Sequence, residues 1–253
     1  GREFAGHAVA KPGRVVVMNM EDSEDTMYGR LYAVCHSYDL DVEAVCQNVI
    51  VWPGDRGPDA DAPPRCRLFK RPGEVAKPDI DELARELRAG QIDAIVLDPL
   101  LKLHQENEND NVAIGAVMDA ADDLARCGNV GVMLVHHTGK GDRKVGEADA
   151  SRGASSIGTS GRITKTLYPA NADDAQAYGL GPRFRATHCR LDDAKMNDAP
   201  METVPQWFER MTYPLSADGT VSTYALRAIG TPSVVKEVVA HPVATKIYEF
   251  MKL

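Results

Sequence analysis

The sequence contains no C-x-x-C pair, no long apolar segment and no excess of positive charge. Its five cysteines are widely spaced and odd in number, which argues against a disulfide framework and against a zinc knuckle. A reducing cytoplasm is therefore the expected compartment. The longest central apolar run, residues 130–135, is far too short to span a bilayer, so we expect no membrane partner.

The charge balance is acidic, with a net charge of −8 at pH 7. Such a chain is not held on nucleic acid by its overall charge, although a local basic loop can still bind a phosphate backbone. Hydrophobic residues make up 43% and charged residues 26%, a globular balance that excludes a disordered or collagen-like chain. The length of 253 residues allows one large α/β domain, or one domain with a small appendage.

Short apolar runs alternate with amphipathic segments over the first 135 residues. The runs are β-branched or aliphatic, which is typical of strands buried on both faces of a parallel sheet. They lie at residues 14–20, 48–52, 92–97 and 130–135. Helices are predicted after the acidic segment 21–25, at 79–89 and at about 112–126. This alternation predicts a mostly parallel sheet flanked by helices.

The pattern changes after about residue 163. A strand at 163–167 is followed by segments typical of antiparallel strands at 183–190, 206–213 and 221–227, and by a last helix at about 232–252. The predicted fold class is therefore α/β, with antiparallel strands at its C-terminal edge. We expect a core in residues 1–200, and edge strands and a helix, which can open a small accessory domain, in residues 201–253.

Polar residues follow three of the predicted strands. Glu21 and Asp22 follow the first, Asp98 ends the third, and His136 and His137 end the fourth. Each alone is as typical of a helix cap or a turn, but ligands bind at the carboxyl edge of an open parallel sheet, and three such ends favour a site. An ionised Asp98 can hold Mg²⁺ directly or through water, and a carboxylate at Glu21 can polarise a water for attack on a phosphoryl group.

The two adjacent histidines point to opposite faces if they continue the strand, which is poor geometry for joint metal binding. We expect one of His136 and His137 to face the cleft as a hydrogen-bonding sensor, and the other to pack.

The segment from His136 to Lys165 reverses the charge of the chain. It holds six basic residues against three acidic ones, an excess of +3, and four glycines between residues 139 and 153. It can grip a phosphate backbone, or it can be a solvated loop, and the sequence favours neither. The candidate nucleic-acid residues are Lys140, Arg143, Lys144 and Arg152.

An ordered series of short motifs connects these features. The motifs are Asn19-Met20-Glu21-Asp22, Ile95-Val96-Leu97-Asp98-Pro99-Leu100, Glu108-Asn109-Asp110-Asn111, Leu134-Val135-His136-His137-Thr138-Gly139-Lys140-Gly141 and Ser151-Arg152-Gly153-Ala154-Ser155-Ser156. Over about residues 1–200 this series resembles the RecA-like P-loop ATPases of the AAA_25 group, the hexameric RepA-type replicative helicases of plasmids and phages.

The resemblance implies a RecA-like core that binds ATP and Mg²⁺. By motif position Glu21 is the catalytic base and Asp98 is the Walker B magnesium residue, with Asp22 beside it in the cofactor site. His136 or His137 is then the sensor that couples the state of the nucleotide to the DNA loops.

The resemblance also implies a homo-oligomeric ring, expected to be a hexamer, around single-stranded DNA. Lys195 lies where the family places a basic finger that reaches the nucleotide of a neighbouring subunit, and Arg190 is a second candidate. Such a cation neutralises charge on the transferring phosphoryl group.

One family motif is missing, because no G-x-x-x-x-G-K-[ST] occurs in the sequence. In the family this loop and its strand precede the part that matches residues 1–12. We therefore expect weak or absent ATP binding by these residues alone. A truncated copy of a longer ATPase is favoured over a degenerate relative, because Glu21 and Asp98 are both present.

Three functions follow from these observations. The first is an ATP-dependent DNA helicase for plasmid or phage replication. The alternative is a non-hydrolysing DNA-binding or assembly module on a degenerate RecA-like scaffold. A metal-dependent hydrolase using Asp98 with His136 and His137 is disfavoured, because the histidines are adjacent and no third well-spaced ligand is evident.

Overall fold

A computed structural model describes most of the chain. The described residues are 3–4, 7–9, 11–55, 69–71, 74–75, 77–104, 106–138, 146–147 and 156–232.

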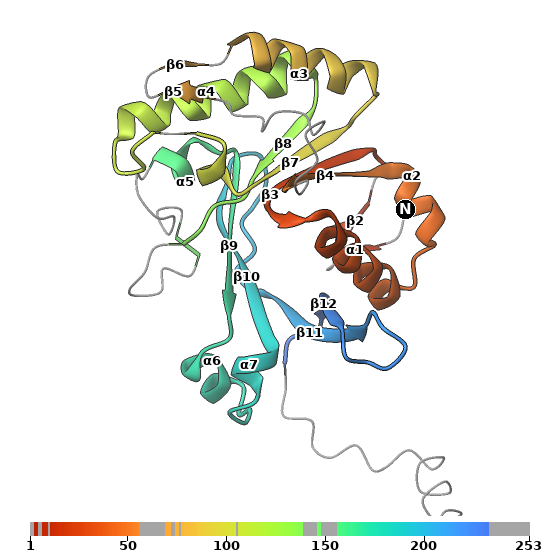
Figure 1. The fold of residues 1–253 in the computed structure, drawn as a ribbon. Coiled ribbons are helices and arrows are strands. Elements are labelled where there is room, and N and C mark those ends of the chain that lie inside the picture. The colour runs from red at the N-terminus through yellow and green to blue at the C-terminus, as the bar shows by residue number, and fades with distance from the viewer. Residues whose placement is uncertain are drawn as a thin grey trace, which may run out of the picture.

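A four-stranded parallel sheet is the centre of the fold (Figure 1). Its order is β4 (Val49–Asp55), β3 (Val15–Ser23), β7 (Ala94–Asp98) and β8 (Gly131–Leu134). All three pairings are parallel, so the carboxyl ends of the strands lie at one edge. The predicted α/β class, with helices around a parallel sheet, is confirmed.

Helices cover the two faces of this sheet unequally. Helices α3 (Lys77–Ala89) and α4 (Asn111–Gly128) lie side by side along one face, and α1 (Glu24–Tyr38) lies under β3 and β4 (Figure 1). The helix α2 (Val42–Asn48), which precedes β4, was not predicted. Between β7 and α4 a 3-10 turn, η1, spans Leu100–Lys102.

Local chemistry sets the helix boundaries. The Ser23 hydroxyl caps α1 by accepting the N–H of Thr26, so Glu21 and Asp22 belong to β3 and not to the first helical turn. The Asp110 carboxylate caps α4, and Asn129 ends that helix in the left-handed conformation at φ 53°.

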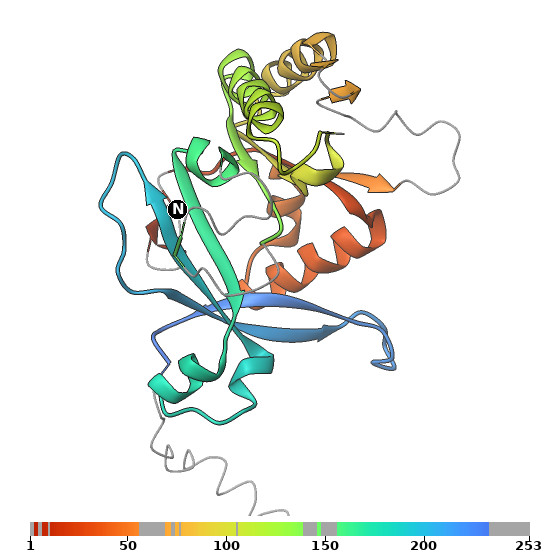
Figure 2. The same ribbon diagram turned by 90° about the vertical axis from the view of Figure 1, so that its left-hand side faces the viewer.

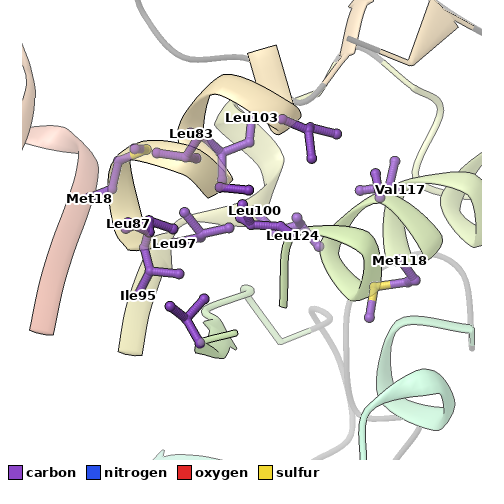
Figure 3. Packing of buried hydrophobic residues seen from close by; sticks show 14 of the residues in the cluster. Met18, Leu83, Leu87, Ile95, Leu97, Leu100, Leu103, Val117, Met118 and Leu124 are labelled. Carbon is purple, nitrogen blue, oxygen red and sulfur yellow. The ribbon is translucent and has the colours of Figure 1, made fainter. Parts of the chain in front are cut away.

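The main hydrophobic core lies between the sheet and the α3–α4 layer (Figure 3). Its side chains alternate along β3 and β7 and recur at helical spacing on α3 and α4, which is why one face of each element is apolar. Fully buried members are Met18, Ile95, Leu97, Leu100, Leu103, Ile114, Val117 and Leu124.

The strand β8 is not buried on both faces, which corrects the prediction for residues 130–135. Met133 is 60% exposed and Val135 is 36% exposed, whereas Val132 and Leu134 pack against the core. The reason is position. Within the described residues β8 is an edge strand with β7 as its neighbour, and α4 packs against it.

A second, antiparallel sheet follows, confirming the predicted change of pattern (Figure 2). Its order is β12 (Ser222–Ile229), β11 (Gln206–Pro214), β10 (His188–Met196) and β9 (Ile163–Pro169). The predicted strand at 183–190 is wrong in its bounds. A helical turn, α7 (Phe184–Thr187), precedes β10, because Phe184 packs into a small core with Trp207.

Three further helical elements and two short hairpins complete the description. The helices are α5 (Ser156–Ser160) and α6 (Ala172–Ala177), besides α7. The hairpins are β1 (Glu3–Phe4) with β2 (His7–Ala8), and β5 (Phe69–Arg71) with β6 (Glu74–Val75). No described helix is both long enough and apolar enough to cross a membrane. The predicted last helix falls almost entirely outside the described residues.

Hydrogen bonds join the antiparallel sheet to the first helix. The Tyr38 hydroxyl donates to the Leu226 carbonyl and accepts from the Ala228 N–H, each at 2.8 Å. The Arg227 guanidinium donates to the Ser37 carbonyl. The division at residue 200 stays a prediction, although β10 and β11, on its two sides, are hydrogen-bonded neighbours in one sheet.

Candidate functional site

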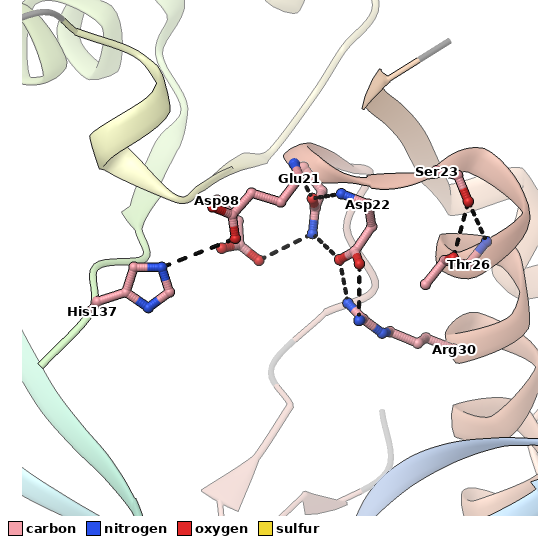
Figure 4. A network of polar contacts seen from close by, with 8 residues as sticks. Glu21, Asp22, Ser23, Thr26, Arg30, Asp98 and His137 are labelled. Atoms are coloured by element: carbon pink, nitrogen blue, oxygen red, sulfur yellow. Dashed lines mark hydrogen bonds and ion pairs between the residues drawn. The ribbon is translucent and has the colours of Figure 1, made fainter. Parts of the chain in front are cut away.

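The ends of β3 and β7 bring the predicted acidic residues together (Figure 4). Asn19 on β3 lies directly opposite Asp98 on β7 in the parallel register. Glu21 and Asp22 follow Asn19 within two and three residues, so their side chains lie at the same edge. The structure thus groups Glu21, Asp22 and Asp98 at the carboxyl edge of the sheet, where ligands bind in open α/β folds.

Asn19 organises this group, and the sequence analysis did not assign it a role. Its side chain is 6% exposed. Its Oδ1 accepts the N–H groups of Glu21 and Asp22, both at 2.9 Å, and its Nδ2 donates to Asp22 at 2.9 Å and to Asp98 at 3.3 Å. One amide therefore holds the turn after β3 against the end of β7. The available signal was a polar residue inside an apolar strand.

Asp22 is held by a second partner, Arg30 on α1. The guanidinium makes a bidentate pair with the carboxylate, with N–O distances of 2.5 and 3.0 Å. Because Arg30 and Asn19 both bind this carboxylate, Asp22 connects the sheet edge to α1. A cofactor-binding role for Asp22 stays a prediction.

The Asp98 carboxyl is the most perturbed member of the group. Burial raises its pKa above the ordinary value, and the negative charges of Asp22 and Glu21 raise it further. Three carboxylates gathered at one edge suit a divalent cation, and Mg²⁺ is commonly held by one or two carboxylates together with phosphate oxygens and water. The donor set therefore fits Mg²⁺.

The raised pKa of Asp98 gives a stability prediction. Folding disfavours the ionised carboxyl, so the fold is penalised once the pH rises above the folded-state pKa, as at pH 7.5. Asp98→Asn removes that penalty, and its amide oxygen still accepts from Asn19. In magnesium-free buffer we expect it to stabilise the fold by about 1 kcal/mol, or about 2–4 °C in Tm. Thermal unfolding measures this, with exposed Asp119→Asn as the matched control; a lower Tm for Asp98→Asn contradicts the prediction.

Glu21 is the accessible carboxylate of the site. Its side chain is 43% exposed, with Lys102 Nζ 4.0 Å from Oε1 and His137 Nε2 4.0 Å from Oε2. These contacts leave the carboxylate accessible to a small molecule at the sheet edge. Lys102, on η1, is a second residue that the sequence analysis missed.

The two histidines separate as the strand geometry predicts. The His137 side chain is 60% exposed and faces Glu21, whereas the His136 side chain is 6% exposed and faces Glu108, with 3.5 Å between Nε2 and Oε1. His137, rather than His136, is thus the histidine at the site. His136 faces away from the edge, so Asp98 and the two histidines do not form one ligand set. No cluster of three or more potential metal ligands occurs among the described residues.

A family model described as an AAA domain, AAA_25, matches residues 1–143, which is more than half of the chain. The chain belongs to the AAA_25 family. The solved ATPase domain of a helicase is also similar, at 13% sequence identity and a TM-score of 0.48, over 77% of this chain and 70% of that one. The matched range of the AAA_25 model contains all four strands of the parallel sheet and every residue of the acidic group.

Beyond the AAA_25 match, the structure places the two candidate finger residues differently. The Arg190 side chain is 20% exposed and pairs with Asp174 and Asp192, at 2.6 Å in each case, and its guanidinium lies 5.6 Å from the centre of the Trp207 ring. These contacts raise its pKa further. Within this chain Arg190 is therefore a structural cation.

Lys195 is half-buried on β10, opposite Thr164, where the register of β10 and β9 shifts. The finger role of Lys195 stays a prediction. The candidate nucleic-acid residues Lys140, Arg143, Lys144 and Arg152 lie outside the described residues.

Proposed function

We propose that this AAA_25 chain is the core of a helicase-type ATPase that couples ATP hydrolysis to binding of single-stranded DNA. The observation that carries the proposal is the convergence of Glu21 and Asp98 from neighbouring parallel strands, organised by the buried Asn19. An accessible carboxylate beside a half-buried one is the pair that metal-assisted phosphoryl transfer needs: one group to activate water and another to hold the cation.

Each residue then has a defined task. Asp98 holds Mg²⁺, which when bound neutralises charge on the phosphate oxygens. Glu21 accepts the proton of the attacking water, and its exposure gives that water access. His137, 4.0 Å from Glu21, senses the state of the site and is continuous with the segment after β8. Asn19 and Arg30 position the turn between them.

Phosphate binding needs a group that residues 1–253 do not contain, because they include no G-x-x-x-x-G-K-[ST] motif. We therefore propose that the hydrolysing unit contains a phosphate-binding loop outside these residues, and we call the polypeptide with both parts the full-length protein. In it, Lys195 acts as a basic finger toward a neighbouring subunit in a homo-hexameric ring. The segment with Lys140, Arg143, Lys144 and Arg152 binds the DNA. The proposed setting is plasmid or phage replication in the cytoplasm.

A direct assay tests the function. The full-length protein with Mg²⁺ and ATP is expected to hydrolyse ATP faster when single-stranded DNA is added, and residues 1–253 alone are expected not to hydrolyse it. Lys195→Ala subunits mixed into wild-type protein are expected to reduce turnover more than in proportion to their fraction, because each finger acts on its neighbour. Turnover that ignores DNA, or falls only in proportion, contradicts the coupling or the finger.

The missing motif favours one second function, a non-hydrolysing DNA-binding or assembly module. This alternative predicts strand binding or oligomerisation without hydrolysis, even for the full-length protein. Fluorescence anisotropy with a labelled oligonucleotide, run beside the hydrolysis assay at two salt concentrations, separates the two functions.

A further inference from the structure

A buried polar cluster behind the site is not used by the proposed mechanism. It joins the end of β8 to the turn before α4. The side chains of Glu108 and His136 are 13% and 6% exposed, and Glu108 Oε1 lies 3.5 Å from His136 Nε2. A buried carboxylate is costly unless a partner offsets its charge, so this pair fixes the position of both groups.

His104 completes the cluster and makes the pairing directional. It is 6% exposed, and its Nδ1 accepts the N–H of Glu106 at 3.1 Å. Burial lowers the pKa of His104, which keeps that ring neutral at pH 7. The charge of Glu108 is therefore not offset by His104 and acts on His136.

The backbone carries this restraint to the site. The Val135 N–H donates to the Leu97 carbonyl at 2.9 Å, and the Val135 carbonyl accepts the Leu100 N–H at 2.8 Å. These bonds clamp the chain immediately before the histidines to both ends of the β7–η1 connection. Because successive side chains point to opposite sides, holding His136 toward Glu108 turns His137 toward Glu21.

We propose that Glu108 is a positioning residue, which holds His136 and thereby sets where His137 lies relative to Glu21. The inference rests on the proposed function, because it assigns Glu108 to the same site. Glu108 touches neither Glu21 nor Asp98 in the described contacts, so its effect is indirect. Partners of this kind change activity by about 10–100-fold when they are altered at other sites.

The first test needs no activity. Side-chain ¹⁵N spectra of residues 1–253, assigned with single histidine substitutions, are recorded for wild type, Glu108→Gln and the exposed control Glu86→Gln. We expect Glu108→Gln to move the ring signals of both His136 and His137, and Glu86→Gln to move neither. Movement of the His136 signals alone overturns the proposal.

The second test uses hydrolysis by the full-length protein. Glu108→Gln is expected to lower kcat by about 10-fold with an unchanged KM for ATP, whereas loss of packing alone would lower Tm without this split. The double variant Glu108→Gln/His136→Gln is expected to be no slower than the worse single variant, because both act on one path. Additive losses overturn the proposal. If wild type itself shows no hydrolysis, the proposed function fails, and the spectra still decide the role of Glu108.

Discussion

Glu21→Gln in the full-length protein is expected to slow ATP hydrolysis by about 10²–10⁴-fold, the usual contribution of a general base. The glutamine side chain has nearly the same shape, but it cannot take a proton from water at neutral pH. The backbone N–H of residue 21 still donates to Asn19 Oδ1, so the turn after β3 is retained.

Nucleotide binding should survive this change. The Glu21 carboxylate has only 4.0 Å contacts with Lys102 and His137, and its side chain is 43% exposed. We expect the dissociation constant for Mg·ATP to change less than about threefold, since little binding energy is lost. Single-turnover hydrolysis and equilibrium titration measure the two quantities, with Glu24→Gln, exposed in the first turn of α1, as the control. Hydrolysis within a factor of three of wild type would remove Glu21 as the base.

Arg190→Met is expected to destabilise the fold by about 3 kcal/mol, or about 10 °C in Tm, because it leaves two carboxylates without their cation. Asp174 is 5% exposed and also caps α6, so it cannot turn to solvent without breaking that cap. The methionine keeps much of the apolar contact with Trp207. The loss therefore reports the charge network rather than packing.

The comparison with Lys195→Met separates structure from function at β10. Lys195→Met is expected to lower Tm far less, while abolishing DNA-stimulated hydrolysis by the full-length protein. Thermal unfolding and hydrolysis are measured on both variants. If Arg190→Met melts like wild type and loses hydrolysis, then Arg190, not Lys195, is the finger.

Much of the fold was predictable because its signals are local. The apolar strands and amphipathic helices of the first 135 residues have the expected periodicity, and their alternation indicates a parallel sheet. Burial of β8 was not predictable, because Met133 and Val132 have the same apolar character and only the neighbouring elements decide which is covered. The segment before β10 failed for a similar reason, since Phe184 forms a turn to reach Trp207.

The site was predictable in part. Polar residues at strand ends meet at one edge by topology, which is why Glu21, Asp98 and His137 could be grouped from sequence. Supporting residues depend on tertiary contacts that no local pattern encodes. Asn19 connects two strands 79 residues apart in sequence through its bond to Asp98, and Glu108 meets His136 across the end of β8.

The central claim is that carboxylates from β3 and β7 converge on one magnesium–nucleotide site. Crystals of the full-length protein grown with Mn²⁺ and a non-hydrolysable ATP analogue test it directly, because Mn²⁺ gives an anomalous signal at its own position. The account predicts that the anomalous peak lies within coordinating or water-bridged distance of Asp98, with the terminal phosphate facing Glu21. A peak and nucleotide bound away from the ends of β3 and β7 would contradict it.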